Sequence, residues 1–160
     1  ESLLDKCINF AGQDKKITLQ EVKDLLGIVE VGQVSALVDF IMRPASAQGS
    51  GEAKHNAKEA IEYINSLADE GIDLQEFAKT LVFYLRQLLL LKINSEFLHA
   101  ENSGFSKEEI ETLKKQAGEL DEKSIQSLLE LFIEAENKMK YASITSLPLE
   151  LAIVSMTIKE

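Results

Sequence analysis

The sequence feature that most constrains the fold is one long apolar stretch, residues 73–97. Its apolar residues recur at the three- and four-residue spacing of an α-helix, at Leu74, Phe77, Ala78, Leu81, Val82, Leu85, Leu88, Leu89 and Ile93. The other side of its middle turns is apolar as well, with Phe83, Tyr84, Leu90 and Leu91. A helix of this kind has to be covered nearly all round. We therefore expect this stretch to run through the middle of a small bundle, over roughly 38 Å at ~1.5 Å per residue.

Polar residues define the start of this helix and keep it out of a membrane. Asp73 and Glu76 have the spacing of a capping box, and Gly71 separates the helix from the one before it. Arg86 and Lys92 interrupt the apolar run, which stays below the ~20 residues that a bilayer crossing needs. The sequence therefore predicts a helix inside a protein, with no membrane partner.

Helical spacing also recurs in the rest of the chain. It predicts helices at about 2–10, 18–26, 32–42, 53–70, 106–117, 121–141 and from 148 onward, with a flexible stretch at 44–52. Ser106 and Glu109 form a second capping box, Gly118 is expected to stop that helix, and Pro148 suits the first turn of the last one. The inward side chains expected in 121–141 are Ile125, Leu128, Leu129, Phe132, Ile133 and Met139. No alternating strand pattern of useful length occurs, so the predicted fold is an all-α helical bundle.

Composition narrows the possible partners. The 160 residues carry 27 acidic and 17 basic side chains, a net charge of −10, and no basic stripe with interleaved aromatics. Direct nucleic-acid binding is therefore not expected. The single cysteine, Cys7, excludes an intrachain disulfide and suits a cytoplasmic protein. The chain starts at Glu1 without a methionine or a signal-peptide pattern, so we expect it to be a fragment.

The first part of the chain differs from the rest. Residues 1–27 contain only two short helical patterns, which bury too little apolar surface to form a core alone. We assign residues 1–27 to the end of a separate small domain and residues 28–160 to the bundle.

Three signatures occur in order along the chain. They are Ser2-Leu-Leu-Asp5 with Ile17-Thr-Leu-Gln-Glu-Val22 and Leu25-Leu-Gly27, Gly71-Ile-Asp-Leu-Gln-Glu-Phe77 with Leu85-Arg-Gln-Leu-Leu-Leu-Leu-Lys92, and Leu147-Pro-Leu-Glu-Leu-Ala-Ile153. Together they resemble the gamma/tau subunit family of the bacterial DNA polymerase III clamp loader. The resemblance implies that residues 1–27 end the lid of an AAA+ ATPase module. It implies that residues 28–160 are the helical collar, which in that family holds five loader subunits together as a ring.

Several motifs of that family are missing here. Gly49-Ser-Gly51 with Lys54 does not have the spacing of a phosphate-binding loop, and no strand precedes it. The resemblance implies that ATP and magnesium bind upstream, in the N-terminal ATPase module. We expect no cofactor, metal, small-molecule substrate or catalytic residue in this fragment.

Residues that could suggest chemistry have plainer explanations. His55 and His99 have no second ligand at metal spacing, and Cys7 lies among apolar neighbours without a histidine pattern. Glu108, Glu109 and Glu111 lie in or beside the first turn of a helix, where the dipole favours negative charge. All of these residues are interpreted as structural or solvated.

Arg86 and Glu150 stand out because each interrupts one of the two most apolar runs. An isolated charge in an apolar place is costly unless it is paired. Two interpretations remain open: both side chains point into solvent, or they form an ion pair across two helices or across a subunit boundary.

The sequence therefore favours a non-catalytic oligomerisation domain. The partners implied by the resemblance are other clamp-loader subunits, namely gamma/tau copies, delta and delta prime. The alternative is a free-standing α-helical adaptor or regulatory domain, which every feature except the family signatures would fit equally well.

Overall fold

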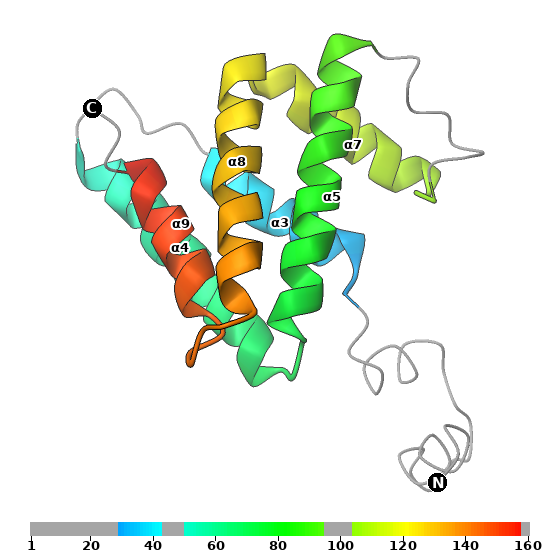
Figure 1. Ribbon diagram of the computed structural model, residues 1–160. Helices are drawn as coiled ribbons and strands as arrows, with labels where there is room; N and C mark the ends of the chain where they lie inside the picture. The colour runs from blue at the N-terminus through cyan, green and yellow to red at the C-terminus, as the bar shows by residue number, and fades with distance from the viewer. Residues whose placement is uncertain (1–28, 43–49, 95–103, 158–160) are drawn as a thin grey trace, which may run out of the picture.

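The computed structural model describes residues 29–42, 50–94 and 104–157. These ranges contain six helices and no strand (Figure 1), which confirms the predicted all-α fold. The helices are α3 (Val31–Met42), α4 (Ser50–Asp69), α5 (Leu74–Ile93), α7 (Lys107–Glu119), α8 (Glu122–Met139) and α9 (Leu147–Thr157). The helices predicted in 2–26, most of the stretch 44–52 and the end of the stretch 73–97 lie outside the described residues.

Five of the helices pack in a circular arrangement in which each helix contacts the next. Helix α5 contacts α8, α8 contacts α9, α9 contacts α4, α4 contacts α3, and α3 contacts α5. Helix α7 lies against α3 and α5 (Figure 1). The core inside this arrangement includes the fully buried Phe77, Leu81, Leu113, Phe132 and Leu149, which come from four of the helices. None of the described helices combines the length and apolar character that a bilayer crossing requires.

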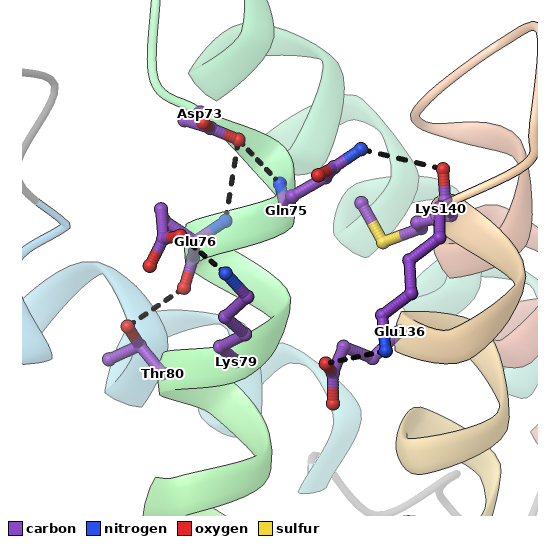
Figure 2. A network of polar contacts seen from close by, with 8 residues as sticks. Asp73, Gln75, Glu76, Lys79, Thr80, Glu136 and Lys140 are labelled. Atoms are coloured by element: carbon purple, nitrogen blue, oxygen red, sulfur yellow. Dashed lines mark hydrogen bonds and ion pairs between the residues drawn. The ribbon is translucent and has the colours of Figure 1, made fainter.

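Helix α5 begins as the sequence predicts. The Asp73 carboxylate accepts hydrogen bonds from the amides of Gln75, at 2.8 Å, and Glu76, at 3.3 Å (Figure 2). The second half of the predicted capping box is not formed, because the Glu76 carboxylate accepts from the Lys79 ammonium instead. Before this cap, Gly71 has a φ of 87°, which ends α4 in a conformation that glycine adopts most easily.

Helices α7 and α8 follow each other with one cap each. The Ser106 hydroxyl accepts from the Glu109 amide while the Glu109 carboxylate accepts from the Ser106 amide, so this predicted capping box is confirmed. The prediction that Gly118 stops α7 is wrong, because the helix continues to Glu119 and Gly118 does not have a positive φ. Asp121 caps α8 by accepting from the Ser124 amide at 2.9 Å.

One residue of α8 faces differently from the predicted pattern, and α9 exposes part of its apolar surface. Ile133 was expected inside the bundle, but it is 40% exposed because it lies at the edge of the polar side of α8. On α9, Leu149, Ala152 and Ile153 are buried, whereas Leu151 is 54% exposed. The last helix therefore buries one side only.

Candidate interaction surface

The exposed side of α9 is the largest departure from an ordinary polar surface. Ile144, just before the helix, and Leu147, Leu151 and Val154 on it are 61%, 42%, 54% and 37% exposed. The separations of four and three residues place Leu147, Leu151 and Val154 on one face of the helix, and Ile144 lies in the segment just before it. We call these four residues the α9 stripe. Apolar residues grouped in this way differ from the scattered exposed leucines of a normal surface and indicate a contact site.

The chain holds the α9 stripe in place from behind. Leu149 and Ile153 point to the opposite side of the helix and are almost fully buried, because α9 packs against both α4 and α8 (Figure 1). The first turn is fixed by Pro148, which is buried, and by the Glu150 amide, which donates to the Ser146 carbonyl. Leu147, Leu151 and Val154 are therefore presented on a helix that packs against two others.

A second apolar face lies on the outer side of α5. Phe83 and Ile93 are 44% and 59% exposed, and Leu90 is half-buried between them along the helix. Arg86, which is exposed, lies on the same face. We call Phe83, Arg86, Leu90 and Ile93 the α5 stripe. The Phe83 ring stacks on Phe105 with centroids 5.8 Å apart, so its position is set by the loop before α7.

Arg86 and Glu150 do not meet within the chain. Arg86 is exposed on α5, Glu150 is half-buried on α9, and the described residues contain no ion pair between them. Helix α8 lies between the two helices (Figure 1). Pairing across a subunit boundary stays a prediction.

A buried polar cluster, which the sequence analysis missed, connects three helices. The Tyr84 hydroxyl on α5 donates to the Gln116 side-chain oxygen on α7 at 2.7 Å. The Gln116 amide donates in turn to the Ser35 carbonyl at 3.0 Å and to the Asp39 carboxylate at 2.8 Å, both on α3. Burial, followed by the nearby charges of Asp39 and Glu109, raises the pKa of Tyr84 well above its usual range. The cluster fixes α5, α7 and α3 relative to one another and offers no free reactive group.

The family comparison agrees with this architecture. A family model of DNA polymerase III subunits gamma and tau domain III matches residues 17–159. The chain belongs to this family. It is therefore a part of the clamp loader, as the sequence signatures indicated. No curated protein matches the chain in direct comparison.

Two of the three sequence signatures lie on helices that the structure describes within the domain III match. The second signature forms the capped start and the middle of α5, and the third forms α9 from its first residue. The match begins at residue 17, inside the segment 1–27 that was assigned to the lid. The boundary between lid and domain III stays a prediction.

The remaining candidate residues of this domain III have structural roles where they are described. Glu109 completes the capping box of α7, Glu111 pairs with Lys114 at 3.1 Å, and Glu108 is exposed. Cys7, His99 and the side chain of His55 lie outside the described residues. Within 29–42, 50–94 and 104–157, no group of three or more His, Cys, Asp or Glu side chains has the arrangement of a metal site.

One open hollow of about 470 Å³ lies where the ends of α3, α7, α8 and α9 come together. Apolar side chains such as Ile41, Leu128 and Met156 line much of it, and its charged groups are Asp121 and Lys123. The Asp121 carboxylate already accepts from Ser124 as the cap of α8. The Asp121 carboxylate in this hollow therefore serves the fold of α8.

Proposed function

We propose that this domain III is a non-catalytic assembly module that joins clamp-loader subunits to one another. The observation that supports this role best is the α9 stripe, four apolar side chains, three of them on one face of α9, that the described residues leave exposed. Because the chain belongs to the gamma and tau domain III family, we expect its partners to be other clamp-loader subunits. The proposed partners are further gamma/tau copies, delta and delta prime.

The partners of the described polar side chains support a role in assembly rather than in catalysis. The buried Tyr84 bonds to Gln116, which bonds in turn to α3, while Glu109 and Asp121 take part in the caps of α7 and α8. The net charge of −10 opposes binding to the phosphate backbone of DNA. In this proposal nucleotide and DNA contacts belong to other parts of the loader.

The test is an assembly measurement on the whole 160-residue chain. Sedimentation velocity is run on the chain alone and after mixing with the delta and delta prime subunits. We expect a concentration-dependent mass above that of the monomer, or co-sedimentation with the loader subunits. A chain that remains monomeric and sediments apart from every loader subunit would contradict the proposal.

A calorimetric titration with ATP and magnesium tests the non-catalytic part. We expect no saturable heat, because the chain contains no phosphate-binding loop. Saturable ATP binding together with phosphate release would assign the chain an activity that this proposal denies.

A further inference from the structure

Gln116 on α7 is a buried side chain whose amide group is engaged at both ends. Its oxygen accepts from the Tyr84 hydroxyl on α5 at 2.7 Å. Its nitrogen donates to the Ser35 carbonyl at 3.0 Å and to the Asp39 carboxylate at 2.8 Å, both on α3. An amide has one acceptor oxygen and one donor nitrogen, so these bonds fit a single orientation of the side chain. Gln116 therefore joins α5 on one side to α3 on the other.

Helices α3 and α7 are not closely packed beside this polar cluster. A hollow of about 120 Å³ lies there, and its lining includes Val31 and Ser35 of α3, Thr112 of α7 and Tyr84 of α5. Side chains on opposite walls of a hollow lose the contacts that close packing would give them. The hydrogen bonds of Gln116 are therefore a direct link between α3 and α7 at a place where packing is loose.

The polar cluster is connected to the outer face of α5 through Phe105. The Phe105 ring is buried and meets the Tyr84 ring edge-on, with centroids 6.4 Å apart. On its other side it stacks on the Phe83 ring, with centroids 5.8 Å apart. Phe83 is 44% exposed and belongs to the α5 stripe. A continuous series of side-chain contacts therefore runs from α3 through Gln116, Tyr84 and Phe105 to an exposed ring on α5.

We propose that Gln116 is a positioning residue that couples α3 to the outer face of α5, so that a shift of α3 changes how firmly the Phe83 ring lies against Phe105. Helix α3 is the first helix that the structure describes, and the chain reaches it from residues 1–28. A displacement that arrives through that part of the chain acts first on α3. The cluster then passes it to α5, because its bonds hold only while α3, α7 and α5 keep their relative positions. This inference goes beyond the proposed function and does not depend on it.

A tryptophan at position 83 tests the coupling, because the chain contains no other tryptophan. Phe83→Trp in the full chain is the reference, and acrylamide quenching of its fluorescence measures how accessible the ring is to solvent. Gln116→Leu, added to this reference, cuts the link between α5 and α3. We expect the quenching constant to rise at least roughly twofold, the lower end of the effects found between coupled residues. Asp39→Ala should give a smaller rise, because the Ser35 carbonyl still accepts from Gln116.

The matched control is Tyr63→Phe, which removes a different hydrogen bond to α3, from the Tyr63 hydroxyl on α4 to the Gln33 carbonyl at 3.0 Å. It should leave the quenching constant unchanged, because it does not touch the cluster. Circular dichroism checks that every variant is folded. If Gln116→Leu leaves quenching unchanged, or if Tyr63→Phe raises it equally, the inference is wrong. If Gln116→Leu does not fold, Asp39→Ala decides by the same comparison. None of these outcomes measures assembly, so the proposed function is judged separately.

Discussion

Helices α5 and α9 are both apolar around most of their circumference, but the chain covers them differently. Helix α5 packs against α3, α7 and α8 and buries nine of its residues. Helix α9 packs against α4 and α8 and leaves Leu147, Leu151 and Val154 exposed. Burial of apolar surface drives folding only where the surface is actually removed from water. The buried side of α5 therefore stabilises the single chain, whereas the described residues leave one side of α9 exposed.

The largest expected effect concerns the covered region. Phe132 on α8 is fully buried, so Phe132→Ala should lower the free energy of unfolding by about 3–5 kcal/mol through lost burial and a cavity. Urea denaturation followed by circular dichroism measures the loss. The matched control is Ile133→Ala, one residue along and 40% exposed, which should cost about 1 kcal/mol or less. Equal losses of unfolding free energy at the two positions would show that the buried and exposed faces of α8 are wrongly assigned.

A smaller effect is expected at the buried polar cluster. Gln116→Leu removes the partner of the Tyr84 hydroxyl and should lower the free energy of unfolding by about 1–3 kcal/mol, because a buried donor is left unsatisfied. Adding Tyr84→Phe removes that donor as well. The double variant should therefore lose less than the sum of the two single losses. Strict additivity in a urea-denaturation cycle would mean that the two side chains are not coupled.

The helix caps should contribute less to the free energy of unfolding than the buried polar cluster does. Ser106→Ala removes the hydroxyl that accepts from the Glu109 amide and should cost about 1 kcal/mol in thermal or urea unfolding. Ser143→Ala changes an exposed serine in the loop before α9 and serves as its control, with an effect within about 0.5 kcal/mol. A cost at Ser106 no greater than at Ser143 would show that the cap does not stabilise α7.

The smallest effect is a pH dependence at the start of α8. Hydrogen bonds from the Ser124 side chain and amide hold the pKa of Asp121 below its usual value. A carboxyl group with a lowered folded pKa stabilises the fold above its unfolded pKa, and this stabilisation is lost as pH falls through the folded pKa. Asp121→Asn keeps a capping side chain but does not titrate. The difference in unfolding midpoint between the two proteins should therefore change between neutral and acidic pH, and a constant difference would contradict this account.

The sequence predicted the buried core around α5, α7 and α8 better than it predicted the exposed face of α9. The helical spacing of Phe77, Leu81 and Leu85 and the caps at Asp73, Ser106 and Asp121 are local signals, and they specified α5, α7 and α8 closely. The prediction that α7 ends at Gly118 was wrong because a glycine can lie inside a helix when the residue after it is also helical. Periodicity alone did not separate Ile133 from Phe132, since adjacent positions at the edge of an apolar face look alike in sequence.

The sequence did not predict the stripes or the polar cluster, because both depend on tertiary contacts between helices. Helix α9 has apolar residues distributed around its circumference, so its pattern gave little indication of which side α4 and α8 cover. Gln116 is separated by 32 residues from Tyr84 and by 77 from Asp39, so no local pattern links them. The interruption of the apolar runs by Arg86 and Glu150 was the one available signal that these two helix faces differ from an ordinary core.

Replacing part of the α9 stripe tests most directly whether this face serves assembly rather than folding. The variant Leu147→Gln with Leu151→Gln is compared with Ile133→Gln, an exposed apolar position on α8 outside both stripes. The account predicts that thermal midpoints of both variants stay within about 2 °C of the unmodified chain. It also predicts that sedimentation shows loss of association with copies of the chain and with loader subunits only for the α9 variant. Full association by the α9 variant, or a collapse of its thermal midpoint, would contradict the account.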